Sequence, residues 1–266
     1  MRAVGFGTKM KRLWHEGKER SAMSRELKTE NVTREVSIPA VGMQLGGTLV
    51  LPHDASGLIL FAHGSGSGRF SPRNQSVARS LQRAGLATLL IDLLGEGEAS
   101  DLRKVFDIEL LADRLQSAAI LLGRDPATRG LRLGFFGAST GAAAALVAAA
   151  RCPELVGAVV SRGGRPDLAS GDLPDVTAPT LLIVGGLDQE VLELNRQAFA
   201  LLRCPREMVV IPGATHLFPE PGALEEVARL AEQWFLRHLP PDSRPRRDSA
   251  SATGDRVPRS DMDDLC

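Results

Sequence analysis

Short apolar runs alternate with longer segments of mixed polarity along most of the chain. Residues 33–40 and 44–52 alternate apolar and polar positions, which predicts an opening pair of strands. Six further runs are apolar at nearly every position, as in strands buried on both faces: residues 57–64, 85–94, 131–137, 155–164, 178–186 and 206–213. This order predicts an α/β fold, with a mostly parallel eight-stranded sheet covered by helices on both faces.

Two segments between these runs show helical periodicity most clearly. In residues 106–124 the apolar stripe consists of Ile108, Leu111, Leu115 and Leu122, with Glu109, Asp113 and Arg114 largely off it. Residues 222–239 repeat the pattern and end at Pro240. Each helix is therefore expected to bury one face against the sheet.

The two ends of the chain lack such patterning. Residues 1–32 are polar and of mixed charge, which predicts a flexible basic extension. Residues 240–266 are rich in Pro, Ser, Asp and Arg, which predicts a disordered tail. The folded part is expected to be one domain over residues 33–239 of the 266-residue chain.

Composition narrows the class of protein. Lys plus Arg balance Asp plus Glu to a formal net charge of zero, and the signs are interleaved, which argues against nucleic acid as a partner. The longest apolar run, residues 141–150, is far shorter than the roughly 20 residues of a membrane span. The amino end has no apolar signal core, so a cytoplasmic location is expected. The three cysteines have no metal-ligand spacing, so no metal is predicted.

The sharpest chemical signal is the sequence GASTG at residues 137–141. It follows an apolar strand and precedes an Ala-rich helix, the context of a nucleophile elbow with Ser139 as nucleophile. The alternative is a Gly-rich turn whose serine caps the helix. A serine nucleophile needs a base, and His216 follows the run at residues 206–213, at the strand end where such sheets build their sites. His238 is instead expected to cap carbonyl groups at the end of the last helix.

The histidine in turn needs an acid. Asp188 follows the run at residues 178–186 and completes the chain order Ser, Asp, His; Asp167 satisfies the same order and is the alternative. For the oxyanion, the backbone N–H groups of Thr140 and Ser65 are the candidate donors. His63, in the same Gly-rich loop as Ser65, is expected to hold that loop in place.

These motifs together, HGSGSG, GASTG, GGLD and GATH, resemble the α/β-hydrolase superfamily and, within it, the dienelactone-hydrolase-like branch. The segments HGSGSGRFSPRNQ and SRGGRPDLA are also similar to bacterial hydrolase domains that often follow a phosphoribosyltransferase domain. Dienelactone hydrolases carry a cysteine nucleophile. Serine at position 139 therefore implies an ester or thioester rather than a dienelactone.

The resemblance implies a serine hydrolase that acts on a small molecule without a cofactor. The short stretch between Ser139 and Asp188 leaves no room for a large cap domain, so an open site is expected. Arg162 and Arg165 could bind an anionic group of the substrate or pair with nearby aspartates, and the sequence leaves both open. Two other functions remain: an acyltransferase on the same triad and a non-catalytic small-molecule-binding protein.

Overall fold

The computed structural model describes residues 31–40 and 42–240, and these residues are built around one eight-stranded sheet. The strands are β1 (Val32–Ala40), β2 (Met43–Leu51), β3 (Gly57–Ala62), β4 (Leu86–Ile91), β5 (Arg132–Ala138), β6 (Val156–Arg162), β7 (Thr180–Gly185) and β8 (Arg206–Ile211). Their order across the sheet is β1-β2-β4-β3-β5-β6-β7-β8. The pairs β1–β2 and β2–β4 are antiparallel and all the others are parallel. The predicted α/β fold is confirmed.

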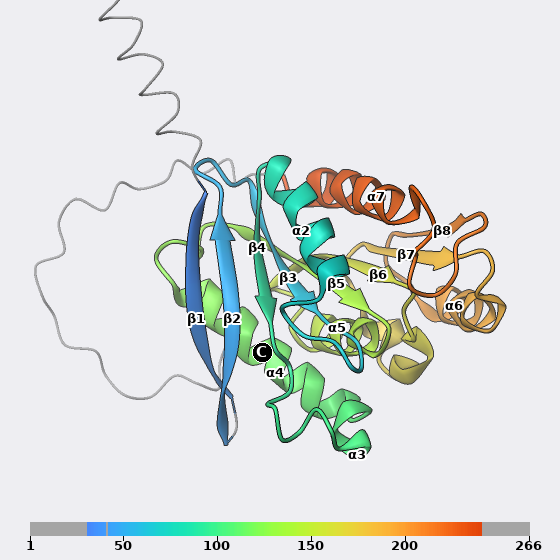
Figure 1. Cartoon of the computed structure of the whole chain (residues 1–266), viewed down its shortest axis with the longest axis horizontal. Coiled ribbons are helices and arrows are strands. Elements are labelled where there is room, and N and C mark those ends of the chain that lie inside the picture. The colour runs from blue at the N-terminus through green and yellow to red at the C-terminus, as the bar shows by residue number, and fades with distance from the viewer. Residues whose placement is uncertain (1–30, 41, 241–266) are drawn as a thin grey trace, which may run out of the picture.

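Helices cover both faces of the sheet (Figure 1). They are α2 (Pro72–Arg83), α3 (Leu102–Val105), α4 (Ile108–Arg124), α5 (Thr140–Arg151), α6 (Gln189–Leu201) and α7 (Ala223–His238). Residues of α4 and α5 share one buried apolar cluster with the sheet, and residues of α2 and α7 share the other. The sheet is therefore a central layer with a core on each side, as the doubly apolar strands predict.

The apolar stripe predicted for residues 106–124 is confirmed in α4, but the prediction for one polar residue was wrong. Ile108, Leu111, Leu115 and Leu122 are all buried. Arg114, expected largely off the stripe, is only 3% exposed. It can be buried because its guanidinium pairs with Glu98, which lies in the loop after β4.

The connection from β6 to β7 is short. In the described residues it holds two 3₁₀ turns, η1 (Pro166–Ala169) and η2 (Leu173–Asp175), and no large cap domain. The edge of the sheet where the parallel strands end is thus left uncovered by any inserted domain.

The two ends of the described chain lie at the opposite edge of the sheet. Val32 pairs with Leu51, at the edge where the parallel strands begin. Leu239, after α7, lies against three glycines of the same edge, Gly57, Gly134 and Gly157; a Cβ there would approach its side chain within 2.7 to 3.4 Å. These glycines allow the end of α7 to lie directly on the sheet.

The predicted terminal segments fall almost entirely outside the described residues, so their expected flexibility and disorder stay predictions. Among the helices that the structure describes, none combines the length and the apolar character that a membrane span requires.

Candidate active site

Ser139 occupies a strained turn between β5 and α5. It is one of two non-glycine residues with positive φ in the described chain, with φ of 52°. The turn is tight because Gly137 and Gly141 have no side chains: a Cβ at Gly137 would lie 2.4 Å from the Cα of Ala142, and one at Gly141 would lie 2.3 Å from the carbonyl oxygen of Ala62. Although Ser139 stands at the N-cap position of α5, its side chain makes no capping hydrogen bond. The hydroxyl is therefore not used as a helix cap.

Asp188 and His216 are brought together by the loops after β7 and β8. Their strands are parallel neighbours, and backbone N–H groups of Gly186 and Leu187 donate to carbonyls of Ile211 and Ala214. His216 Nδ1 lies 2.7 Å from Asp188 Oδ2. An Nδ1–H that donates to this carboxylate leaves Nε2 as the basic nitrogen.

The end of β6 lies between the histidine loop and the turn at Ser139, and it contacts both. The Ser139 N–H donates to the carbonyl oxygen of Arg162 at 3.4 Å, and Gly163 follows Arg162 in the chain. A Cβ at Gly163 would lie 3.0 Å from the carbonyl oxygen of His216. Phe218, with φ of 57° and 1% exposure, anchors the loop in the core beneath α7. In the described structure the Ser139 hydroxyl and His216 are not hydrogen bonded to each other. In enzymes without substrate, catalytic hydrogen bonds are often long or poorly aligned, so this does not exclude His216 as a candidate base.

The alternative acid, Asp167, is engaged elsewhere. Its two carboxylate oxygens accept hydrogen bonds from Arg165 at 2.9 and 2.8 Å. The same pairing occupies Arg165, one of the two arginines considered for substrate binding. Arg162, the other, is 6% exposed and has no such carboxylate partner among residues 31–40 and 42–240.

The candidate oxyanion donors border the elbow. Neither the Ser65 nor the Thr140 backbone N–H has an acceptor within the described part of the chain, so both remain available. Their loops are in direct contact: a Cβ at Gly64 would lie 2.8 Å from Ser139 Cβ and 2.9 Å from the carbonyl oxygen of Ala138. Backbone N–H groups on two contacting loops are a common way to hold one oxyanion.

His63 is built into the loop as a structural residue. Its Nδ1 lies 2.9 Å from the Gly64 carbonyl oxygen, and its Nε2 accepts from the Leu93 N–H at 2.8 Å. Burial lowers the pKa of His63, which favours the neutral ring that these two bonds require. His238 lies on the last turn of α7, with its ring 4.3 Å from that of Trp234. The expected capping of carbonyl groups is wrong, because the ring makes no hydrogen bond within the described residues and its Nε2 is buried.

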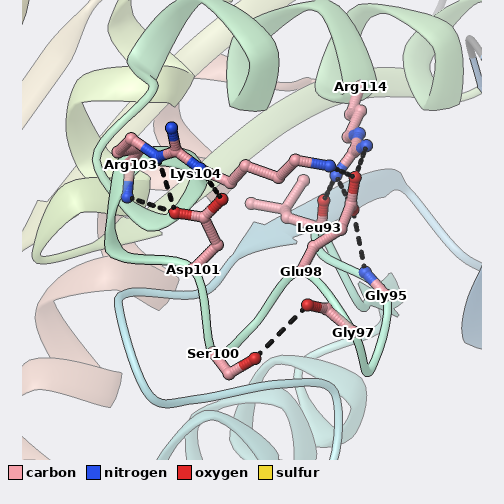
Figure 2. A network of polar contacts seen from close by, with 9 residues as sticks. All are labelled: Leu93, Gly95, Gly97, Glu98, Ser100, Asp101, Arg103, Lys104 and Arg114. Carbon is pink, nitrogen blue, oxygen red and sulfur yellow. Dashed lines mark hydrogen bonds and ion pairs between the residues drawn. The ribbon is translucent and has the colours of Figure 1, made fainter.

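A polar network braces the loop that supports His63 (Figure 2). Arg114 donates to the Leu93 carbonyl and to both carboxylate oxygens of Glu98, and Lys104 also binds Glu98. Hydrogen bonds from Arg114 lower the pKa of Glu98 to about 2, with smaller contributions from Lys104 and the Gly95 N–H. Sequence reasoning missed this network because its partners belong to different segments.

We expect Glu98→Gln to lower the free energy of unfolding by about 3 kcal/mol at pH 7, because buried Arg114 loses its counter-charge. The pKa of Glu98 is lower in the folded state than its ordinary 4.5, so this stabilisation is complete above about pH 4.5 and is lost as pH falls toward 2. Urea unfolding at pH 7 and pH 3 checks this. The difference in the free energy of unfolding between wild type and Glu98→Gln should be smaller at pH 3 than at pH 7.

Glu109→Gln is the matched control, because Glu109 pairs with Arg151 at an exposed position. Its effect should stay within about 0.5 kcal/mol at both pH values. A Glu98→Gln gap that is equally large at pH 3 would contradict the assigned role of the Glu98 charge.

Comparison with known proteins identifies the family of the chain. The family model described as "Dienelactone hydrolase family" matches residues 73–239. The chain belongs to the dienelactone hydrolase family. It is 56% identical to a dienelactone hydrolase from Anabaena variabilis of known crystal structure, with a TM-score of 0.76 and coverage of 79% of this chain and 99% of that one. Est1E from Butyrivibrio proteoclasticus, 16% identical, shares the fold with a TM-score of 0.67 over 77% of this chain and 98% of that chain.

Two curated sequences from Mycobacterium tuberculosis strains are also similar to this member of the family. Each is named "Putative phosphoribosyl transferase" and is 56% identical over 205 residues, 77% of this chain. The chain spans about half of their length, because the match covers 46% of each. The fold is that of α/β-hydrolases, and the family is one of hydrolases. In the described residues no cluster of three or more His, Cys, Asp or Glu side chains is arranged to hold a metal ion.

Proposed function

We propose that this protein is a serine hydrolase that cleaves a carboxylic ester or thioester through an acyl-enzyme. The observation that carries the proposal is the strained Ser139, whose hydroxyl makes no capping hydrogen bond and whose N–H donates to the end of β6. The next residue of that segment, Gly163, lies against the loop of His216, which is paired with Asp188. Backbone strain of this kind is costly and is retained where geometry serves a reaction.

In the proposed reaction Ser139 Oγ attacks the carbonyl carbon while His216 Nε2 takes the hydroxyl proton. The N–H groups of Thr140 and Ser65 hold the oxyanion that forms. The tetrahedral intermediate collapses, the bond to the leaving alcohol or thiol breaks, and His216 returns the proton to that group. Water then attacks the acyl carbon and gives a proton to His216. The bond between the acyl carbon and Ser139 Oγ breaks, His216 returns the proton to Oγ, and the free acid leaves. Asp188 orients the imidazole and stabilises its charged form.

The test is labelling of the folded protein with a fluorophosphonate probe, read by peptide mass spectrometry. We expect the adduct on the peptide that contains Ser139, no adduct in Ser139→Ala, and strongly slowed labelling in His216→Ala. Ser65→Ala is the matched control, since it removes a nearby exposed hydroxyl but keeps the backbone donor. If folded wild-type protein stays unlabelled at Ser139, the hydrolase proposal fails and a small-molecule-binding role takes its place.

Gly64→Ala should lower kcat for a short acyl ester by about a hundredfold or more, because the added Cβ would press on Ser139 Cβ and displace the Ser65 donor. Gly171→Ala is the control, since a Cβ there meets nothing within 4 Å. Ester hydrolysis and labelling by the probe are measured on both variants. If the activity of Gly64→Ala is within twofold of wild type, the assignment of the Ser65 N–H as an oxyanion donor is wrong.

A further inference from the structure

The guanidinium of Arg162 is a buried cation that no carboxylate of the described residues pairs with. Its Nη2 donates to Asn74 Oδ1 at 3.2 Å, its Nε has no partner, and the residue is 6% exposed. Desolvation, followed by repulsion from Arg73, lowers its pKa to about 10. The side chain therefore stays charged at neutral pH. Buried charges in proteins are normally paired, and within the described part of the chain no acidic side chain pairs with this one.

A second unneutralised arginine lies beside it. Arg73 stands in the first turn of α2, and the described residues give it neither an ion pair nor a hydrogen bond; its Nε is buried and unpartnered. The first turn of α2 contains no acidic residue, so its positive dipole end adds to the same potential. Arg69, in contrast, is neutralised by Asp92 and Glu35.

This cationic cluster adjoins the proposed catalytic loops. The Arg162 carbonyl accepts from the Ser139 N–H, and the ring of Phe218, two residues after His216, lies 5.9 Å from the Arg162 guanidinium carbon. Helix α2 follows the loop that carries Ser65. An anion bound here is thus bordered by segments from the nucleophile, histidine and oxyanion loops.

We propose that Arg162, Arg73 and the amino end of α2 form a subsite for a compact oxyanion, a carboxylate or phosphate-like group carried by the substrate. The inference rests on the proposed function, because it specifies the substrate of Ser139. Guanidinium groups bind such oxyanions through paired N–H donors, and Asn74 holds Arg162 in position. The substrate is then an ester or thioester with a negative charge away from the bond that is cleaved.

The experiment compares three matched p-nitrophenyl esters: butyrate, which is neutral, hemisuccinate, which ends in a carboxylate, and 3-phosphonopropionate, which ends in a phosphonate. We expect wild type to prefer one anionic ester over butyrate by about tenfold or more in kcat/KM. The preferred ester identifies the anion. Arg162→Gln and Arg73→Gln should each reduce the preference, mainly by raising KM for the anionic ester. Arg162→Lys should keep part of it, and Arg79→Gln, on the exposed side of α2, should leave it unchanged.

Direct binding separates this inference from the proposed function. Inorganic phosphate or succinate should raise the melting temperature of Ser139→Ala but not of Ser139→Ala/Arg73→Gln. Hydrolysis of butyrate without any anionic preference, or equal losses for all three esters in both arginine variants, overturns the subsite and leaves the hydrolase proposal intact. If no ester is cleaved and Ser139 resists the probe, the hydrolase proposal fails. If, in addition, neither phosphate nor succinate raises the melting temperature of Ser139→Ala, the subsite proposal fails as well.

Discussion

His216→Ala should reduce kcat for ester hydrolysis by about 10⁵- to 10⁶-fold, the largest loss expected from any single substitution outside Ser139. The reason is that, among the described residues, no other histidine is placed to act as base for Ser139. His63 has both ring nitrogens engaged, His53 lies beside Asp54 in the loop after β2, and His238 lies on the last turn of α7. Steady-state hydrolysis of a short p-nitrophenyl ester measures the loss, with circular dichroism to show that the fold is retained.

The double variant Ser139→Ala/His216→Ala provides the control. Because nucleophile and base act as one unit, the double variant should be no slower than either single variant. Losses that multiply would mean that His216 acts independently of Ser139, which is incompatible with its role as general base.

Asp188→Asn should lower kcat by about 10⁴-fold, while Asp167→Asn should change it less than threefold. The amide cannot stabilise the charged imidazole and favours the wrong tautomer, although it fills the same space 2.7 Å from His216 Nδ1. Asp167 instead pairs with Arg165. The pH dependence of kcat in both variants measures the effect. A large loss in Asp167→Asn with a small one in Asp188→Asn would exchange the roles of the two acids.

Local patterns were sufficient to predict the layers of the fold and the segments around the site. Doubly apolar runs locate the strands because both faces of a parallel sheet are buried. GASTG locates the turn at Ser139 because that geometry excludes side chains at Gly137 and Gly141. Chain order alone left Asp188 and Asp167 as alternatives, and only the geometry of the loops after β7 and β8 brings Asp188 to His216.

Features that depend on distant partners were not accessible from the sequence. Arg114 lies at a position where helical periodicity predicts a largely solvated side chain, and it is buried only because Glu98 reaches it from another loop. The left-handed Phe218 has no local signal, since a bulky residue rarely adopts that conformation. The role of Asn74 could not be predicted either, because its partner Arg162 is 88 positions away in the sequence.

The arrangement of the two described ends has a consequence for how this hydrolase can be joined to other protein. The chain enters β1 at Val32 and leaves α7 at Leu239, and both points lie at the edge where the parallel strands begin. Ser139, Asp188 and His216 follow strand ends at the opposite edge. Any polypeptide attached at either point therefore starts about the full length of a strand away from the site. Neither attachment point lies beside the proposed catalytic residues, so a polypeptide joined there does not begin in the path proposed for the substrate.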